Sequence, residues 1–297
     1  MKNIVAIFDG MGNQMFHYAL SLAINNGGKI ECNDYLANKH SNYGPALSAA
    51  FGIEIKNKFV TNWLIRFTRK CVMFSLKKQY RVITLPLING MEFLGIRIIT
   101  DYDIKMIENK LFKPFIQIYC GRFQSEKYFK GKKEEVQKSF TFDKNKVSEK
   151  SQPIAKKIAA ENSVSIHIRR GDYLDKKNLA IFENICTLDY YNKAVQYMIK
   201  HVERPVFYVF SDDILWTKEK LNLPNAFFID WNSGSNSWED MFLMSLCKHN
   251  IIANSTFSWW GAWLNRNENK IVVCPAKYTN IYASNEFFPA DWHKMNG

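Results

Sequence analysis

Short hydrophobic runs alternate with helical patterns throughout the second half of the chain. Runs typical of β-strands lie at 163–168, 205–210, 226–229, 250–253 and 270–274. The intervening segments have the spacing of amphipathic helices, at about 189–201, 214–221, 238–247 and 258–265. Strands that alternate with helices in this way predict a parallel sheet covered on both faces. This half is therefore expected to form a doubly wound α/β domain.

The first half begins with the same pattern and then becomes less regular. A strand is expected at Ile4–Phe8 and a helix from about Asn13 to Asn25, with glycines between them. The stretch 131–151 is polar and highly charged, which is typical of a domain boundary. We therefore expect two Rossmann-like α/β domains, at 1–150 and 151–297, that face each other across a cleft.

Charge is unevenly distributed over the 297 residues, whose formal net charge is +12. No acidic residue lies between Glu54 and Glu92, and aromatic residues such as Trp63 and Phe67 are interleaved with the basic ones there. The basic residues of this stretch are Lys56, Lys58, Arg66, Arg69, Lys70, Lys77, Lys78 and Arg81. It fits either a helix pair with a solvated basic face or a peripheral membrane contact through 56–81. The net charge alone also admits a nucleic-acid partner.

The six cysteines are widely spaced, and several lie inside apolar runs. Because no C-x-x-C and no histidine cluster is present, reduced buried thiols are expected and a zinc site is not. The apolar run after Met1 is too short for a signal peptide, and no later run has the length of a membrane span. We therefore expect a cytoplasmic protein, soluble or peripheral on the inner face of the membrane.

Polar clusters follow four of the expected strands. They are the segments 167–172 (HIRRGD), 211–213 (SDD), 230–232 (DWN) and 254–258 (NSTFS). Since ligands of open α/β sheets bind beyond the carboxyl ends of the strands, these clusters predict a site there. Strand alternation puts His167 and Arg169 on one face and Arg170 on the other, so one arginine can face a phosphate while the other braces the structure.

Each cluster also has a purely structural interpretation. Arg170 could pair with Asp172, and Asn254, Ser255 or Thr256 could cap a helix. Asp240 has capping-box spacing after Ser237, and Asp213 could cap the next helix. A metal at Asp212 and Asp213 is disfavoured because no further acid or histidine lies at ligand spacing.

Taken together and in this order, the motifs resemble the α-1,2-fucosyltransferases of glycosyltransferase family 11. The carrying segments are 9–19 (DGMGNQMFHYA), 167–173 (HIRRGDY), 211–213 (SDD) and 254–260 (NSTFSWW). The chain departs from the family pattern at Asp9, where glycine is usual, and at His17, where glutamine is usual. These departures concern the acceptor and the linkage.

The resemblance implies a GT-B fold and transfer of fucose from GDP-β-L-fucose, with inversion, to a sugar hydroxyl. It implies an acceptor-side domain at 1–150 and a GDP-fucose-binding domain at 151–297, with no metal cofactor. The residues expected to bind the donor are His167, Arg169, Ser211, Asp212, Asp240, Asn254, Ser255, Thr256, Phe257, Gly12 and Asn13. His17 and Asp34 are expected on the acceptor side.

Catalytic roles are expected for four residues. Arg169 would stabilise charge on the leaving diphosphate, and Asn13 would orient the acceptor hydroxyl. Asp172 and Asp9 are candidate bases, although a dissociative transition state needs little help from a base. The acceptor implied is a galactose-terminated oligosaccharide, such as a lipid-linked precursor of a bacterial surface polysaccharide like O-antigen.

Three other functions compete with this interpretation. The fold could serve a fucosyltransferase of another linkage or a different nucleotide-sugar transferase, which guanine recognition by Asp240 would distinguish. A catalytically inactive sugar-binding module would not turn over the donor. A nucleic-acid-binding protein would show a basic stripe and a steep salt dependence, but that class does not predict polar clusters at strand ends.

Overall fold

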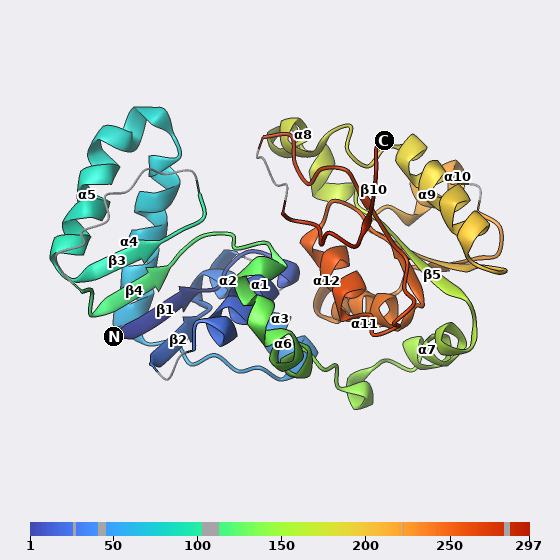
Figure 1. Ribbon diagram of the computed structural model, residues 1–297, viewed down its shortest axis with the longest axis horizontal. Helices are drawn as coiled ribbons and strands as arrows, with labels where there is room; N and C mark the ends of the chain where they lie inside the picture. The colour runs from blue at the N-terminus through green and yellow to red at the C-terminus, as the bar shows by residue number, and fades with distance from the viewer. Residues whose placement is uncertain (26–27, 41–45, 103–112, 222, 282–285) are drawn as a thin grey trace. The chain divides into compact units, whose positions relative to one another are not determined.

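The computed structural model describes residues 1–25, 28–40, 46–102, 113–221, 223–281 and 286–297. Within these ranges the chain divides into two compact units, Met1–Ser139 and Phe140–Gly297. Both units are parallel α/β structures, as the sequence pattern predicts (Figure 1). No helix in the described ranges is long and apolar enough to cross a membrane.

The N-terminal unit contains a four-stranded parallel sheet in the order β2-β1-β4-β3. Its strands are β1 (Lys2–Ala6), β2 (Lys29–Asn33), β3 (Ile96–Ile99) and β4 (Ile116–Tyr119). Its helices are α1 (Met11–Ala23), α2 (Tyr35–His40), α3 (Ala46–Phe51), α4 (Phe59–Ser75), α5 (Arg81–Phe93) and α6 (Lys133–Ser139). Strand β1 lies inside the sheet, and both of its faces are covered by apolar packing.

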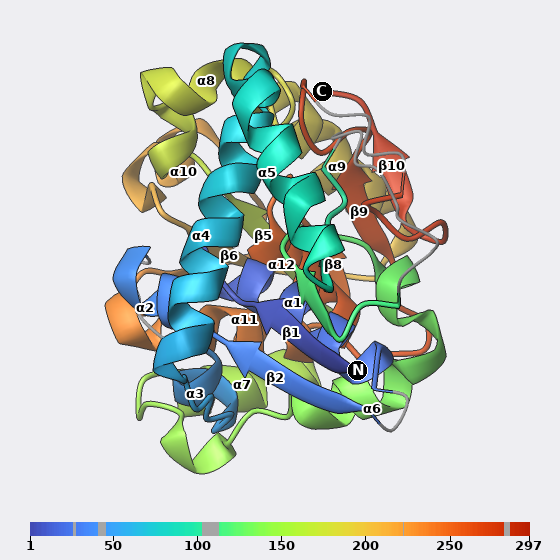
Figure 2. The same cartoon turned by 90° about the vertical axis from the view of Figure 1, so that its left-hand side faces the viewer.

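The expected helix pair in the basic stretch is present as α4 and α5, which lie side by side (Figure 2). Ile65 and Val72 of α4 and Ile88 of α5 are buried in the same apolar cluster as Ile4 of β1. The basic residues of α4 occupy other faces of the helix. One face of the pair therefore covers the sheet. Arg66 and Lys70 are exposed, whereas the Arg69 guanidinium packs on Phe8 of that cluster.

The C-terminal unit contains a six-stranded parallel sheet in the order β10-β9-β8-β5-β6-β7. Its strands are β5 (Ser163–Ile168), β6 (Val206–Ser211), β7 (Ala226–Ile229), β8 (His249–Ile251), β9 (Val272–Pro275) and β10 (His293–Met295). Its helices are α7 (Ser151–Ala160), α8 (Lys176–Phe182), α9 (Leu188–His201), α10 (Ile214–Lys220), α11 (Trp238–Leu246) and α12 (Thr256–Leu264).

Strand β5 organises this sheet because alternate residues face different helices. Val164, Ile166 and Ile168 are buried against Tyr190 and Met198 of α9. On the opposite face, the Ser165 hydroxyl accepts a hydrogen bond of 2.7 Å from the buried Asn250 amide of β8. The alternation thus puts His167 on the face that carries the polar contacts.

The division between the units falls after Ser139, inside the charged stretch 131–151 but before the position 150 suggested by composition. Aromatic contacts explain the difference. Phe140 packs edge-on against Trp260 at 5.1 Å between ring centroids, and Phe142 stacks on Trp238 at 6.0 Å. The Ser148 hydroxyl also donates a 2.7 Å hydrogen bond to buried Glu239. These residues therefore belong to the C-terminal unit.

The tryptophan-rich segment after the strand-end cluster forms core. Trp259 and Trp260 are fully buried, and Trp259 donates from its indole nitrogen to the Phe287 carbonyl at 2.8 Å. All six cysteines are free, and Cys71, Cys120, Cys247 and Cys274 are buried, which accords with the apolar runs around them.

Candidate functional site

The topology of the C-terminal sheet indicates where a ligand site is expected. The chain leaves β5 to form β6 and β7 on one side, then returns to place β8 on the other side of β5. The crevice between the carboxyl ends of β5 and β8 is therefore a topological switch point, where open α/β sheets bind ligands. His167 and Arg169 end β5 at this crevice, and Asn254 and Ser255 follow β8.

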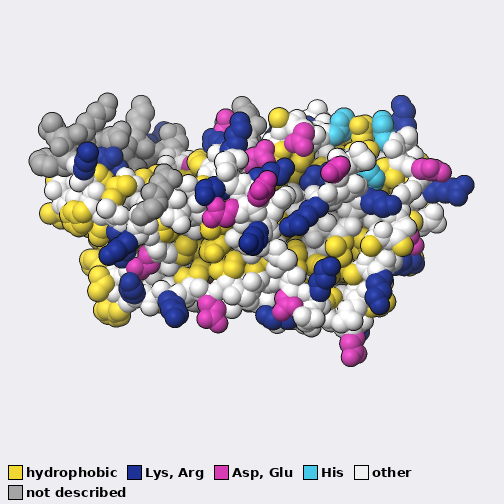
Figure 3. Space-filling model, turned by 60° about the horizontal axis from the view of Figure 1, so that its bottom comes forward, with side chains coloured by type: hydrophobic (Ala, Val, Ile, Leu, Met, Phe, Trp, Pro, Cys, Tyr) yellow, Lys and Arg dark blue, Asp and Glu magenta, His cyan; other side chains and the backbone are white. Residues whose placement is uncertain are grey.

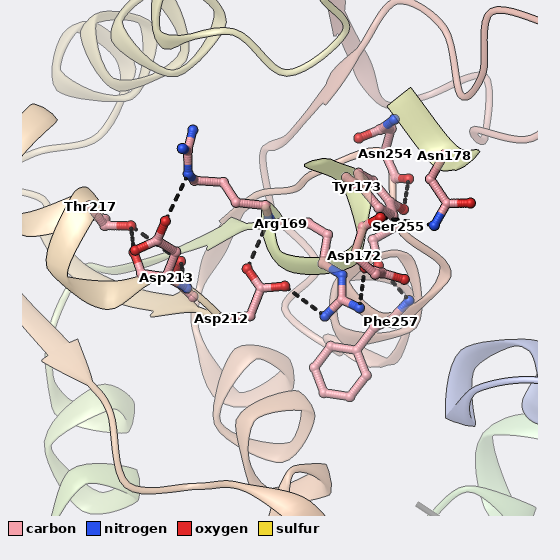
Figure 4. A network of polar contacts seen from close by, with 12 residues as sticks. Arg169, Asp172, Tyr173, Asn178, Asp212, Asp213, Thr217, Asn254, Ser255 and Phe257 are labelled. Atoms are coloured by element: carbon pink, nitrogen blue, oxygen red, sulfur yellow. Dashed lines mark hydrogen bonds and ion pairs between the residues drawn. The ribbon is translucent and has the colours of Figure 1, made fainter. Parts of the chain in front are cut away.

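Arg169 is the centre of the polar network at these strand ends (Figure 4). Its Nη1 lies 2.9 Å from Asp212 Oδ2, and its Nη2 lies 2.6 Å from Asp172 Oδ1. Burial alone would lower the pKa of the guanidinium, but Asp212 and Asp172 outweigh it and the pKa is raised. Arg169 is thus held charged, with 30% of its side chain exposed to solvent.

Arg170 takes different partners and braces the structure. Its Nε donates to Asp213 Oδ2 at 3.0 Å, and its guanidinium lies 3.8 Å from the centre of the Trp216 ring of α10. The bracing role predicted for one of the two arginines is therefore seen at Arg170, and phosphate binding by Arg169 stays a prediction. The suggested pairing of Arg170 with Asp172 is wrong, because Asp172 contacts Arg169 instead.

Gly171 is required by the close approach of Asp212. A Cβ at this position would lie 2.7 Å from Asp212 Oδ2, the oxygen that holds Arg169. The other oxygen of Asp212 accepts from the Arg170 backbone amide at 2.8 Å. Asp212 is therefore fixed at both oxygens, so a larger residue at 171 would displace it and loosen Arg169.

Two neighbouring residues serve local structure. The Asp213 carboxylate caps α10 by accepting from the Trp216 amide at 3.2 Å, as the sequence suggested. The Ser211 hydroxyl accepts from the Asp213 amide at 3.0 Å and from the Thr217 hydroxyl at 3.2 Å. The contacts of the Ser211 hydroxyl therefore hold the start of α10.

His167 is 6% exposed, and its ring lies 5.7 Å from the ring of Phe257. Burial, together with the adjacent charge of Arg169, lowers the pKa of His167 to about 3. The ring is consequently neutral at pH 7. Its Nδ1 is buried and has no hydrogen-bond partner among the described residues. Leaving such a group unpaired costs about 1–3 kcal/mol, a cost that a bound ligand can relieve.

The segment after β8 forms the other wall of the crevice. Asn254 is buried, donates to the Tyr278 carbonyl at 3.0 Å and accepts from the Tyr173 hydroxyl at 2.8 Å. The Ser255 hydroxyl accepts from the Phe257 amide at 3.3 Å and so caps α12, while Thr256 begins the helix. The first amides of α12 and its dipole favour an anion at this point.

Asp240 lies in the first turn of α11 and has an unusual proton affinity. Burial raises the pKa of Asp240 to about 7; a 2.8 Å hydrogen bond from Asn232 opposes this, and the nearby Glu239 adds to it. A carboxyl group that titrates near neutral pH is a functional-site candidate. Asn232 could not be recognised from the sequence as its partner, because the two meet through the turn between β7 and α11.

The residues predicted at the N-terminal loop lie at the carboxyl ends of β1 and β4, the switch point of the N-terminal sheet. Asp9 adopts φ = 63°, a left-handed conformation that favours glycine. Its carboxylate pairs with Arg69 of α4 at 3.2 Å. Asn13 accepts from the Gln124 side chain at 2.6 Å, and Gly12 is buried at the start of α1. Arg69 and Gln124 carried no motif that would have identified them.

The two residues predicted for the acceptor are buried. His17 is 1% exposed, its Nε2 lies 2.9 Å from the Gly121 carbonyl, and its ring packs on Phe8. Burial lowers the pKa of His17 to about 3, although the hydrogen bond to Gly121 opposes this shift. Asp34 is 5% exposed and accepts from Asn57 at 2.6 Å. An acceptor role for either residue stays a prediction.

Comparison with known proteins identifies the family. The model of Glycosyl transferase family 11 matches residues 4–296. The chain belongs to this family. This confirms the family recognised from the motifs, and the protein is a glycosyltransferase of the group that includes α-1,2-fucosyltransferases.

Three relatives illustrate the family's range. An α-1,2-colitosyltransferase from Escherichia coli is 30% identical over 296 residues, 97% of both chains. The O-antigen biosynthesis glycosyltransferase WbnK from Escherichia coli is 48% identical over 128 residues, only 42% of either chain. The galactoside α-(1,2)-fucosyltransferase 1 of Saimiri sciureus is 23% identical over 62% of this chain and 53% of its own length. Among solved structures, the fucosyltransferase NodZ from Bradyrhizobium matches with a TM-score of 0.46 at 13% identity, covering 88% of this chain and 91% of that chain.

No group of three histidine, cysteine, aspartate or glutamate side chains that could hold a metal ion occurs in the described ranges. The cationic side chains that follow β5 are Arg169 and Arg170, and the N-terminus of α12 adds a partial positive charge.

Proposed function

We propose that the protein transfers L-fucose from GDP-β-L-fucose, with inversion, to the 2-hydroxyl of a terminal galactose. The observation that carries the proposal is the Arg169 network at the switch point, in a chain of glycosyl transferase family 11. The linkage is supported by the α-1,2 specificity in the names of two relatives.

The donor occupies the C-terminal unit in this proposal. Arg169 and the first amides of α12, around Ser255 and Thr256, contact the diphosphate. His167 and Asp240 contact the guanosine in this proposal. The His167 ring lies 5.7 Å from that of Phe257 and has a nitrogen without a partner among the described residues, and Asp240 supplies a buried carboxylate. Asp212 pairs with Arg169 at 2.9 Å, and we assign it the role of a positioning residue that orients the guanidinium.

The catalytic effect follows from where charge develops. As the bond to fucose breaks, negative charge grows on the β-phosphate while the sugar becomes oxocarbenium-like. A preorganised guanidinium stabilises the growing charge by about 3–4 kcal/mol without reorganising at that moment. This charge supplies what a divalent cation supplies in metal-dependent transferases, so we propose that catalysis requires no metal.

The proposed mechanism makes little use of a general base. Asp172 and Asp9 are each held in an ion pair, with Arg169 and Arg69 respectively. Because Asp9 replaces a glycine usual in the family, the shared chemistry does not depend on it. We propose that Asn13 orients the acceptor hydroxyl, with a loose transition state that demands little proton transfer.

The acceptor is proposed to be a galactose-terminated oligosaccharide on a lipid-linked precursor of a surface polysaccharide such as O-antigen, bound by the N-terminal unit. This places the protein in the cytoplasm, at the inner face of the membrane. Supporting residues are exposed on the α4–α5 pair: Phe59 is 86% and Val82 is 82% exposed. Figure 3 shows hydrophobic side chains at the surface on the left, the side on which Figure 1 draws α4 and α5. Apolar residues among lysines and arginines suit an anionic bilayer.

A second candidate donor carries a 3-deoxy sugar. The relative that spans the whole chain transfers colitose, which is L-fucose without its 3-hydroxyl. A site that hydrogen-bonds that hydroxyl rejects the deoxy sugar by 10⁴-fold or more, whereas an apolar site discriminates by about 10–200-fold.

The test is transfer from GDP-fucose and from GDP-colitose to a β-galactoside, with EDTA present and the product linkage determined by NMR. We expect GDP-fucose to have the higher kcat/KM and to give an α-1,2 product. Preference for GDP-colitose would establish the second candidate, and turnover of neither donor would reject both.

A further inference from the structure

The N-terminal unit has a basic cavity that the donor site does not use. Arg66, Arg69, Lys70 and Met73 of α4, together with Leu36 of α2, line a volume of about 250 Å³. Positions 66, 69, 70 and 73 share one helix face, since residues three and four apart are neighbours. We call these five residues the α4 pocket.

Three of the five lining side chains are cationic and none is acidic. Arg69 is paired with Asp9 through Nη2 at 3.2 Å. Arg66 lies 5.8 Å from the ring of Tyr35 and Lys70 lies 6.0 Å from the ring of Phe74, and neither has an ion pair among the residues that the structure describes. The pocket thus carries an excess of positive charge, and like charges at this spacing destabilise a helix.

Arg69 shows the need for a further acceptor most directly. Its guanidinium lies 3.7 Å from the centre of the Phe8 ring, and its Nη1 is buried without a hydrogen-bond partner in the described ranges. Buried polar groups are nearly always paired. An anion in the α4 pocket would neutralise the cations that line it.

We propose that the α4 pocket binds a phosphate group. Arginine presents a planar fork of donors that matches phosphate oxygens, and lysine adds a point charge. The apolar walls Leu36 and Met73, and the exposed Trp63 one turn before Arg66, favour a phosphate attached to hydrocarbon. Assigning that phosphate to a lipid-linked acceptor rests on the proposed function, but phosphate binding itself does not.

The experiment is a calorimetric titration of pyrophosphate into the full chain saturated with GDP, so that the donor site is blocked. The wild type and Arg66→Gln/Lys70→Gln are compared with Lys77→Gln/Lys78→Gln, which removes two exposed charges beyond the end of α4. We expect pyrophosphate binding at least tenfold weaker in the pocket variant and within about twofold in the control. Arg69→Lys, which keeps the charge but removes the fork, is expected to weaken binding severalfold.

The titration is repeated in the Arg169→Ala background, where the substitution disables the donor site and GDP is no longer needed to block it. Pyrophosphate binding that persists there is independent of the donor site, so the two proposals can fail separately. Co-sedimentation with phosphatidylcholine vesicles containing 20% phosphatidylglycerol identifies the source of the phosphate. If Arg66→Gln/Lys70→Gln sediments with vesicles less than the Lys77→Gln/Lys78→Gln control does, the phosphate belongs to a lipid. If both variants lose sedimentation equally but only Arg66→Gln/Lys70→Gln loses pyrophosphate binding, the phosphate belongs to a soluble molecule. Equal pyrophosphate affinity in both double variants, or no pyrophosphate binding once GDP saturates the protein, overturns the proposal.

Discussion

Replacing Arg169 by alanine is the most informative perturbation, because one guanidinium connects three parts of the C-terminal site. It contacts Asp212 at 2.9 Å and Asp172 at 2.6 Å, and 30% of its side chain remains exposed. Alanine removes the only arginine at the switch point that is not committed to Trp216 and Asp213 among the described residues. The variant also leaves two carboxylates where a diphosphate should bind.

The magnitude can be worked from these contacts. A charge-assisted hydrogen bond contributes about 1.5–3 kcal/mol, and removing one oxyanion-type donor costs about 2.7–4 kcal/mol in the transition state. Arg169 already makes a charge-assisted hydrogen bond to Asp172, which a ligand must displace, so only part of that contribution is gained when the ligand binds. A net loss of about 3 kcal/mol is therefore expected, or about 150-fold in kcat/KM. Arg169→Lys keeps the charge without the fork and should recover part of this loss.

The assay is steady-state transfer from GDP-fucose to a β-galactoside, with circular dichroism to verify folding. Arg170→Ala is the matched control, because Arg170 pairs with Asp213 and stacks on Trp216. We expect that control to lower Tm but to keep kcat/KM within about threefold. Activity of Arg169→Ala within threefold of wild type would refute the assigned role, as would an equal loss in the Arg170→Ala control.

Four further predictions follow from the site. The pKa of Asp240 is about 7, raised chiefly by burial, so GDP affinity should rise from pH 6 to pH 8 if the ionised carboxylate binds guanine. Calorimetry in buffers of different ionisation enthalpy should detect the proton released on binding. Asp240→Asn should abolish both the pH dependence and the proton release. His17 and His167 have folded pKa values near 3, so between pH 8 and pH 5 they take up protons only when the chain unfolds. Each should therefore lower the free energy of unfolding by about 2 kcal/mol as the pH falls from 8 to 5, which urea denaturation can measure. A free energy of unfolding that does not change with pH would contradict their burial. Asp9→Gly should leave kcat within tenfold, because glycine suits φ = 63° and the family usually has it there; a loss beyond a hundredfold would make Asp9 the base. Gly171→Ala should displace Asp212 and weaken GDP binding about tenfold, while far-UV circular dichroism stays unchanged.

The C-terminal fold could be predicted from the sequence because its strands are short, apolar and separated by strongly periodic helices. The expected strand 163–168 matches β5 residue for residue, and the helix expected at 238–247 is α11, Trp238–Leu246. Strand β10, three residues near the C-terminus, was missed because His293 and Lys294 give it no apolar pattern. Its existence depends on pairing with β9, which is tertiary information.

The site was predictable where a motif supplied its chemistry. His167, Arg169 and Ser255 could be proposed because they follow β5 and β8, which turn out to be neighbours in one sheet. Their partners could not be assigned, because a strand-end carboxylate such as Asp212 has several arginines within reach. In the sequence Arg69 is one of eight basic residues in its stretch, with nothing to distinguish it. Its contact with Asp9 could not be predicted because the two residues are 60 positions apart along the chain.

The central claim is that Arg169 holds a guanosine diphosphate without help from a metal ion. The most direct test is a calorimetric titration of GDP into the wild-type protein and into Arg169→Ala, both in EDTA. We expect micromolar binding by the wild type and a loss of at least tenfold in the variant. Wild-type binding that appears only when a divalent cation is added, or equal affinity in the two proteins, would contradict it.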